Sequence, residues 1–207
     1  MKFLALFLAF ALFSVCERPP SPDIDHSKHD HTNASPGAMD HSKMESSPGA
    51  AEAPHELQFL DTMIAHHNGA IDMALLVNTR TQRDEMKKLA QGILDEQRRE
   101  TAQMLEWREK WFAGAKPAVN MEFPGMKTGM SGMNMEKLSS LKSNEFDVEF
   151  LKQMIPHHEG AVEMAKALKA DGDHSELQRL AESIINSQTA EIEQMRNWLT
   201  VWSANSK

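Results

Sequence analysis

The chain has 207 residues, which allows one folded domain with tails, and 41% of them are hydrophobic. Its formal net charge of -8 argues against binding to nucleic acid or to an anionic membrane surface through a basic patch. The chain contains 15 Met and 10 His, but a single Cys and no Tyr. Thioethers bind soft metal ions and resist oxidation better than thiols, so this composition favours a metal-binding protein of an oxidising compartment.

The first 16 residues resemble a bacterial export signal. Lys2 is followed by an apolar run over residues 3–13, which is too short to span a membrane as a helix. Cys16 follows directly, and this arrangement resembles a lipoprotein signal in which the cysteine is lipidated. Phe13 and Val15 depart from the usual lipoprotein pattern, so plain cleavage is the alternative. We therefore expect a periplasmic protein of the bacterial cell envelope, attached to a membrane through a lipid anchor.

Residues 17–54 are rich in Pro, Ser, Asp and Gly, and we expect them to form a disordered tail. The residues of this tail that could capture metal ions are His26, His29, His31, Met39, His41 and Met44. Histidine clusters in low-complexity segments favour metal capture, and a plain solvated spacer is the alternative.

The remaining part of the chain, residues 55–207, is an internal duplication. Residues 59–111 align with residues 150–202 without a gap, and 20 of the 53 positions are identical. In each copy, apolar residues at steps of three and four predict a helical hairpin. The segment between the copies, residues 114–144, is long enough to cross a bundle lengthwise, since an extended residue spans up to about 3.3 Å. The sequence therefore predicts an all-α, ferritin-like four-helix bundle made of two duplicated hairpins and a long crossover linker.

The first helix of each hairpin carries two adjacent histidines between two methionines. These candidate metal ligands are Met63, His66, His67 and Met73 in one copy, and Met154, His157, His158 and Met164 in the other. Within one helix the two methionines stand roughly 15 Å apart, because each residue rises about 1.5 Å, so one ion cannot bind both. Two-fold related hairpins could bring the histidine pairs together. Buried imidazoles would then need metal or carboxylate partners.

Polar side chains interrupt the apolar stripe of the second helix in each hairpin. The candidates for a supporting or auxiliary role on this stripe are Gln97, Glu100, Met104, Gln188, Glu191 and Met195. A carboxylate that accepts the N–H of a ligating histidine fixes the orientation of the ring. The alternative is a glutamate that reaches solvent at the end of the bundle. Four tryptophans at the end of this stripe predict a packing cap.

The linker between the hairpins is rich in methionine, with Met121, Met126, Met130, Met133 and Met135 among polar and Gly residues. Such a composition is not typical of a hydrophobic core. Spaced thioethers in a flexible segment suit Cu(I), so we expect these residues to capture metal. The alternative is that they lie over the bundle and cover it.

Mixed His and Met donors without ligating Cys favour copper over zinc, iron or calcium, with Cu(I) preferred and Cu(II) possible. The doubled Met-Ile-x-His-His-x-Gly-Ala-x-x-Met pattern, followed by Gln97/Gln188 and Trp107/Trp198, resembles the family called domain of unknown function 305. The resemblance extends over residues 55–203. It implies a ferritin-like bundle that binds copper outside the cytoplasm through the eight residues of the doubled motif, in copper tolerance or trafficking.

Our leading hypothesis is a copper-binding protein that sequesters or delivers copper and is not an enzyme. Its partners would be copper ions and another copper-handling envelope protein, with no nucleic acid. A ferritin-like metal oxidase that uses Glu100 and Glu191 is one alternative, although the Glu-x-x-His motif of di-iron bundles is absent from both second helices. An envelope interaction module with structural histidines is the other.

Overall fold

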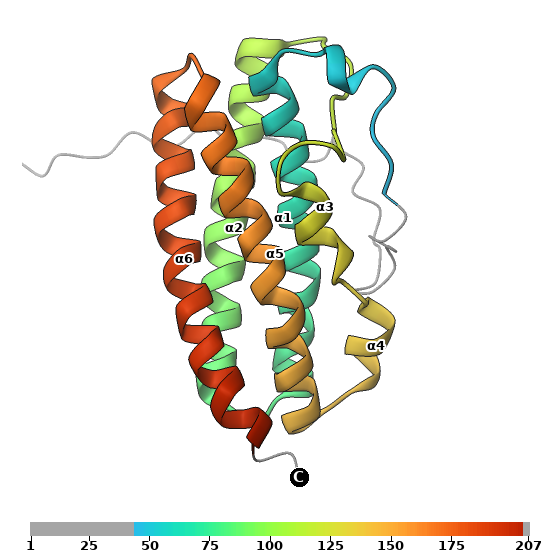
Figure 1. Ribbon diagram of the computed structural model, residues 1–207, viewed down its shortest axis with the longest axis vertical. Helices are drawn as coiled ribbons and strands as arrows, with labels where there is room; N and C mark the ends of the chain where they lie inside the picture. The colour runs from blue at the N-terminus through green and yellow to red at the C-terminus, as the bar shows by residue number, and fades with distance from the viewer. Residues whose placement is uncertain (1–43, 205–207) are drawn as a thin grey trace, which may run out of the picture. The chain divides into compact units, whose positions relative to one another are not determined.

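The computed structural model describes residues 44–204, and all the regular secondary structure in this range is helical. Four long helices lie side by side (Figure 1): α1 (His55–Arg80), α2 (Asp84–Phe112), α5 (Ser143–Asp171) and α6 (Ser175–Ala204). The short helices α3 (Met126–Ser131) and α4 (Met135–Ser140) lie between α2 and α5 in the chain, and a 3-10 turn, η3 (Ala50–Glu52), precedes α1. None of the described helices has the length and apolar character needed to cross a membrane.

Helices α1 and α2 form one hairpin, α5 and α6 form the other, and the hairpins meet where α1 packs against α5. The α1 and α5 helices run antiparallel, as two contacts at opposite ends of the pair show. Glu56 in the first turn of α1 contacts His174 beyond the end of α5. Arg83, beyond the end of α1, contacts Asp147 in the first turns of α5, with 3.1 Å between Nε and Oδ2. Helix α2 therefore ends far from the start of α5.

The segment that joins these two ends, residues 113–142, is called the crossover below. It runs the length of the bundle, and its helices α3 and α4 lie against α5 and α1 (Figure 1). Two antiparallel hairpins joined by one long crossover are the ferritin-like arrangement. The predicted all-α, ferritin-like four-helix bundle is thus confirmed.

The tryptophans form two pairs rather than one cap. Trp107 and Trp111 stack with 5.4 Å between ring centroids, and Trp198 and Trp202 stack with 5.1 Å between centroids. Because α2 and α6 end at opposite ends of the bundle, the two pairs are far apart. The guanidinium of Arg83 lies over the ring of Trp202 at 4.3 Å. One pair therefore packs at each end of the bundle.

Contacts with the folded domain begin earlier in the sequence than we expected. Residues 44–54, which we assigned to a disordered tail, contact the crossover. The backbone N–H of Ser47 donates to the carbonyl of Val119 at 2.8 Å, and that of Met121 donates to Oγ of Ser46 at 2.9 Å. Met44 packs, partly buried, against the core. The predictions for Cys16, His26, His29, His31, Met39 and His41 lie outside the described residues.

One buried carboxylate ties both hairpins together at the end of the bundle where α1 begins. Oε1 of Glu56 accepts the backbone N–H groups of Asp173 and His174, each at 2.8 Å, and Oε2 contacts Nδ1 of His174 at 2.5 Å. The His174 ring in turn stacks on Trp111 with 3.8 Å between centroids. Burial alone would raise the pKa of Glu56, but the hydrogen bonds and charge of His174, with the Asp173 N–H, lower it.

We expect Glu56→Gln to lower the free energy of unfolding by about 1–3 kcal/mol at pH 7, because charge-assisted hydrogen bonds to buried groups are lost. The native pKa of Glu56 is below its ordinary value of 4.5, so its stabilisation is complete above that value and is lost as the pH falls through the native pKa. Urea unfolding of both proteins at pH 7 and at pH 3–4 measures the difference. Glu182→Gln, which removes an exposed ion pair with Lys169, is the control. Equal losses in the two variants at pH 7 would contradict the assignment.

Candidate metal-binding site

The four motif histidines meet inside the bundle, where α1 packs against α5. All four side chains are fully buried, at 0% exposure. The rings of His66 and His157 face each other with 3.7 Å between centroids and 38° between planes. His67 and His158 lie on the outer sides of this central pair, with centroids 6.5 and 6.4 Å from their neighbours. The expectation that the two hairpins bring the histidine pairs together is met by this geometry.

His66 is a buried polar group without a well-formed hydrogen bond. Neither of its ring nitrogens has a partner at good hydrogen-bond geometry, although the backbone of His157 lies close enough to interact weakly with the ring. Burial, and the charges that His67 and His158 would carry when protonated, hold the pKa of His66 well below its ordinary value of 6.5, and the nearby backbone of His157 opposes this only in part. The ring is therefore neutral at pH 7. A neutral imidazole with free nitrogens is the form that binds metal ions.

His67 and His158 are each held by a glutamate from the second helix of the same hairpin. Nε2 of His67 lies 2.9 Å from Oε2 of Glu100, and Nε2 of His158 lies 2.7 Å from Oε2 of Glu191. Since an ionised carboxylate only accepts hydrogen bonds, this contact assigns the ring proton to Nε2. The Nδ1 atoms of both rings are buried without a partner. Glutamate and histidine thus stand in the arrangement that supports a metal-ligating imidazole, with Nδ1 as the free donor atom.

The other residues of the long helices that we predicted as metal ligands or supporting residues are also buried in the bundle. The six methionines of the helical motifs and stripes all have 0% exposure: Met63, Met73, Met104, Met154, Met164 and Met195. Gln97 and Gln188 are 2% and 3% exposed, and the Oε1 atom of each lacks a hydrogen-bond partner. The structure brings these residues into the same core as the histidines. Whether they bind metal stays a prediction.

Of the two interpretations of the methionine-rich crossover, the structure shows the alternative, in which the methionines lie over the bundle and cover it, and not the flexible segment. Four of its methionines belong to the hydrophobic core, with exposed fractions of 0–8%: Met126, Met130, Met133 and Met135. Met121 is partly buried against the same core. The physical reason is that the open α1–α5 face needs an apolar cover, and methionine fills irregular gaps on such a surface. If these methionines bind metal, they do so from fixed positions in the core and not from a flexible segment.

Glycines allow the crossover to approach the histidines closely. A Cβ atom at Gly129 of α3 would overlap Nε2 of His66, and a Cβ atom at Gly160 of α5 would lie 2.6 Å from the Cα of Gly129. On α1, a Cβ atom at Gly69 would lie 3.0 Å from Sδ of Met133 and 3.1 Å from Nε2 of His157. Side chains at these positions would push the crossover away from the bundle. The doubled motif contains Gly69 and Gly160, but the role of all three glycines depends on contacts between distant segments.

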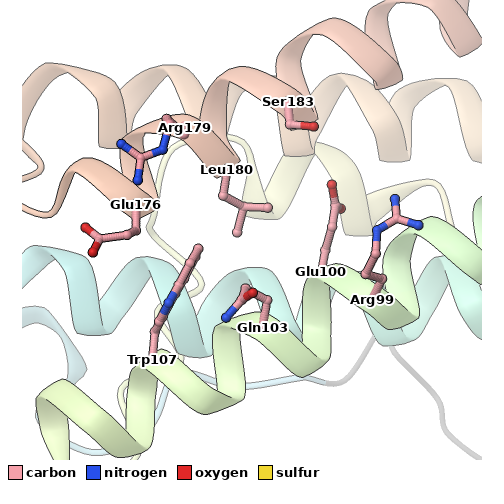
Figure 2. A pocket seen from close by; sticks show the side chains of 8 residues that line it. All are labelled: Arg99, Glu100, Gln103, Trp107, Glu176, Arg179, Leu180 and Ser183. Carbon is pink, nitrogen blue, oxygen red and sulfur yellow. The ribbon is translucent and has the colours of Figure 1, made fainter. Parts of the chain in front are cut away.

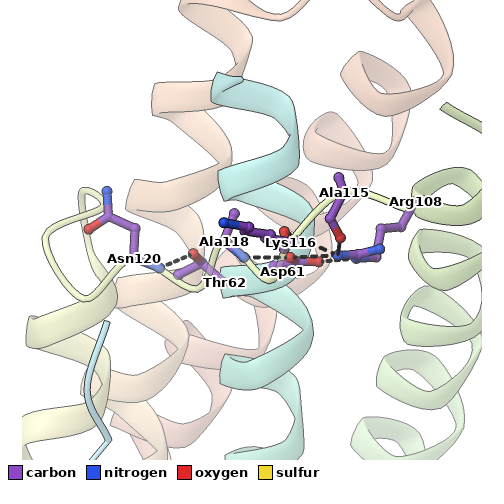
Figure 3. A network of polar contacts seen from close by, with 7 residues as sticks. All are labelled: Asp61, Thr62, Arg108, Ala115, Lys116, Ala118 and Asn120. Carbon is purple, nitrogen blue, oxygen red and sulfur yellow. Dashed lines mark hydrogen bonds and ion pairs between the residues drawn. The ribbon is translucent and has the colours of Figure 1, made fainter. Parts of the chain in front are cut away.

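Polar contacts hold the start of the crossover against α1 (Figure 3). Nε of Arg108 donates to Oδ1 of Asp61 at 2.6 Å, and the backbone N–H of Ala118 donates to Oδ2 of the same carboxylate at 2.8 Å. At the next residue of α1, Oγ1 of Thr62 accepts the backbone N–H of Asn120 at 2.9 Å. Because these groups are buried or nearly so, the contacts fix where the crossover enters. The crossover is thus a positioned part of the site.

On the other side of the bundle, a groove of about 330 Å³ lies between α2 and α6 (Figure 2). It is lined by Arg99, Glu100, Gln103, Trp107, Glu176, Arg179, Leu180 and Ser183. Glu100 lines the groove and its carboxylate also contacts His67, so the groove reaches a side chain that holds one of the buried histidines. Glu96 lies near this groove, and burial together with repulsion from Glu100 and Glu191 raises its pKa. Glu96 is not among the residues predicted from the sequence, because it lies beside the apolar stripe of α2 and not on it.

The buried core holds two kinds of side chain that can bind metal ions, imidazoles and thioethers. Within residues 44–204, no three side chains of His, Cys, Asp or Glu are arranged to hold one ion. The core that holds the buried histidines also holds fully buried methionines, and Sδ of Met133 and Nε2 of His157 lie close to the same point beside Gly69. The fold and the site together define a ferritin-like helical bundle with a buried cluster of imidazoles and thioethers.

This description fits one family. The pattern of the family "Domain of unknown function (DUF305)" matches residues 17–108 and 56–199, and the chain belongs to this family. No similar protein was found among curated proteins. The chain is similar to the solved structure of CopM in the Cu(II)-bound form, with 38% identity over 71% of this chain and 97% of CopM and a TM-score of 0.62.

Other solved structures are similar over the same part of the chain. CopM in the Cu(I)-bound form has 37% identity, covering 71% of this chain and 96% of its own, with a TM-score of 0.61. A protein from Streptomyces coelicolor that is named as a secreted DUF305 protein has 30% identity over 75% of this chain and 95% of its own, with a TM-score of 0.64. A DUF305 fragment from Deinococcus radiodurans has 31% identity over 72% and 97%, with a TM-score of 0.62.

Proposed function

We propose that this chain binds copper ions as cargo through its buried histidines and methionines, and that it sequesters or delivers copper outside the cytoplasm. The observation that carries the proposal is the central pair of His66 and His157. Two fully buried imidazoles face each other at 3.7 Å, and His66 has no well-formed hydrogen bond. Orphaned polar groups in a core cost stability, about 1–3 kcal/mol each, and metal binding compensates for that cost.

The ligand types support copper over other ions. Imidazole nitrogen and thioether sulfur suit Cu(I), while Cu(II) accepts imidazole more readily than thioether. The structures named for CopM in Cu(II)-, Cu(I)- and Ag-bound forms support the same choice. We infer that Cu(I) is the preferred state, because the core offers many thioethers and the carboxylates nearest the histidines are engaged with His67 and His158.

The α2–α6 groove is the surface that fits entry and release of the ion. Glu100 is accessible from the groove and holds His67, so a cation that displaces this hydrogen bond reaches the histidines in one step. The sequence of residues 1–16 supports export and lipid attachment, and a relative named as secreted supports a location outside the cytoplasm. Delivery would require another copper-handling envelope protein as partner.

A metal oxidase is the second candidate function. The repulsion of Glu96 by Glu100 and Glu191 favours it, because carboxylates between helices are a feature of ferritin-like oxidation sites, although no three such side chains of residues 44–204 are arranged to hold one ion. We nevertheless infer that the chain is not an enzyme, since two of these carboxylates already hold histidines. Oxygen consumption over many turnovers with Cu(I) or Fe(II) would favour the oxidase, and stoichiometric binding without turnover would favour cargo binding.

The proposal is tested by anaerobic Cu(I) titration against a chromophoric chelator. We expect the native protein to bind Cu(I), and a variant with Met63, Met73, Met154 and Met164 changed to Leu to bind it at least about tenfold more weakly. Leu is close to Met in volume, so folding should be retained. Met86→Leu is the matched control, since Met86 is fully buried and its counterpart is already Leu177. Unchanged affinity and stoichiometry in the fourfold variant would refute the role of those methionines.

A further inference from the structure

The position of Gly69 inside α1 is unusual, because a glycine in a helix interior costs about 1 kcal/mol relative to alanine. Gly69 lies one turn after His66 and faces the crossover. A Cβ atom there would lie 3.0 Å from Sδ of Met133 and 3.1 Å from Nε2 of His157. A thioether sulfur and an imidazole nitrogen, from segments far apart in the sequence, therefore converge on the space that this glycine leaves open.

The two donor atoms lie near the same point, within reach of a small side-chain adjustment. Because both lie about 3 Å from one point, Sδ of Met133 and Nε2 of His157 are at most about twice that distance apart. Metal bonds to imidazole nitrogen and to sulfur measure about 2.0–2.3 Å. The methionine side chain has three rotatable bonds, so a small rotation brings the sulfur into range.

The surroundings favour a soft ion at this point. The side chain of His157 is fully buried and Met133 is 6% exposed, so water competes little for an ion there. The His66 ring lies against His157 at 3.7 Å and supplies a further neutral imidazole next to the same space. A thioether with imidazoles in an apolar cavity suits Cu(I), which accepts few ligands.

The crossover also makes the two halves of the bundle different. On the His66 side, the backbone of Gly129 lies against the ring. Gly160, which corresponds to Gly69 in the second copy, faces the backbone of α3 and no donor side chain is nearest to it. The thioether of Met133 is therefore presented to one of two equivalent positions, which gives one site of this kind and not a symmetric pair.

We propose that Met133 of the crossover and His157 of α5 form a mixed thioether–imidazole Cu(I) site in the space above Gly69. This inference rests on the proposed copper binding and adds to it a ligand from outside the repeated motif. The crossover then acts as part of the binding site and not only as its cover.

The first test removes the sulfur. We expect Met133→Leu to remain folded, to lower the Cu(I) affinity by about tenfold or more, and to remove one Cu–S contribution from the X-ray absorption spectrum of the loaded protein. The matched control is Met86→Leu, a fully buried methionine that lies outside the proposed ligands and whose counterpart is Leu177; it should keep the native affinity and the native sulfur count. Equal affinity and equal sulfur count in Met133→Leu and the native protein would overturn the inference while leaving copper binding in place. No Cu(I) binding by the native protein would overturn both.

The second test fills the space without removing a donor. Gly69→Ala should weaken Cu(I) binding by a similar factor, since its methyl group would lie within 3.1 Å of both donor atoms. Gly92→Ala is the matched control, because Gly92 is also inside a helix but has nothing within 4 Å of a Cβ atom. Both changes favour the helix equally, so a loss of binding limited to Gly69→Ala supports the site. Native affinity in Gly69→Ala would contradict it.

Discussion

Replacing His66 with leucine is expected to make the copper-free protein more stable and to remove most of its stabilisation by copper. The His66 ring is fully buried and neither nitrogen has a hydrogen-bond partner at good geometry. Each unsatisfied buried polar group costs about 1–3 kcal/mol, whereas leucine fills a similar volume without polar atoms. After allowance for imperfect packing, we expect a gain of about 1 kcal/mol in the free energy of unfolding.

The same substitution should change the dependence of stability on pH. The pKa of His66 in the native protein is well below 6.5, so the unfolded chain takes up a proton in a pH range where the buried ring stays neutral. The native protein therefore loses stability as the pH falls below about 6.5, by up to about 1.4 kcal/mol per pH unit from this group. His66→Leu lacks this contribution, so its stability should fall less steeply between pH 6.5 and 5.

Thermal or urea unfolding with and without Cu(I) measures both effects. Free Cu(I) at a hundredfold excess over Kd stabilises a one-site protein by about 2.7 kcal/mol, and we expect His66→Leu to lose most of this. His55→Leu is the control, since His55 lies in the first turn of α1, outside the motif, and its loss should leave the copper effect intact. A variant that is less stable than the native protein, yet equally stabilised by copper, would show that His66 is structural.

The helices and their pairing could be predicted because the information lies in local spacing and in the duplication. The stripe that contains His66 and Met73 repeats at steps of three and four, and its counterpart in residues 150–202 repeats in the same order. A contact between a stripe glutamate and a motif histidine could also be expected, since a polar residue on an apolar stripe needs a partner, but only the structure shows that Glu100 pairs with His67. Two such pairs at equivalent positions are what a duplicated hairpin requires.

The crossover could not be predicted in the same way. Helices α3 and α4 have six residues each, which is too short for a periodic pattern to stand out among Gly, Ser and Lys. The contact of Met133 with the space above Gly69 joins residues 64 positions apart, and no local signal encodes it. Met-rich polar sequence therefore looked like a flexible segment, whereas the open α1–α5 face gives it a surface to cover.

The positions of the tryptophan pairs could also be predicted only within each hairpin. The stripe placed Trp107 and Trp198 at equivalent positions in their helices, as the structure has them. Only the antiparallel pairing of α1 and α5 places the two pairs at opposite ends of the bundle. A repeated sequence thus determines each hairpin, while the symmetry between hairpins depends on the crossover.

Glu100→Gln is expected to lower the Cu(I) affinity by about 10–100-fold without unfolding the protein. The amide oxygen of glutamine still accepts the N–H of Nε2 in His67, so the ring keeps its orientation and Nδ1 remains the free nitrogen. What is lost is the negative charge that makes the imidazole a stronger donor and balances the charge of a bound cation. Removal of such a carboxylate support commonly costs 10–100-fold in metal affinity.

The duplication supplies a matched variant, Glu191→Gln, which makes the same chemical change at the equivalent position. The side chain of Glu100 is 5% exposed and that of Glu191 is 19% exposed, so water and salt screen the charge of Glu191 more. We therefore expect a smaller loss of affinity in Glu191→Gln, and a loss in Glu100→Gln that depends little on ionic strength. Chelator competition at low and high salt, with unfolding curves to verify the fold, measures this order. The reverse order, or equal affinities in both variants and the native protein, would mean that the glutamates serve the stability of the bundle and not the binding of copper.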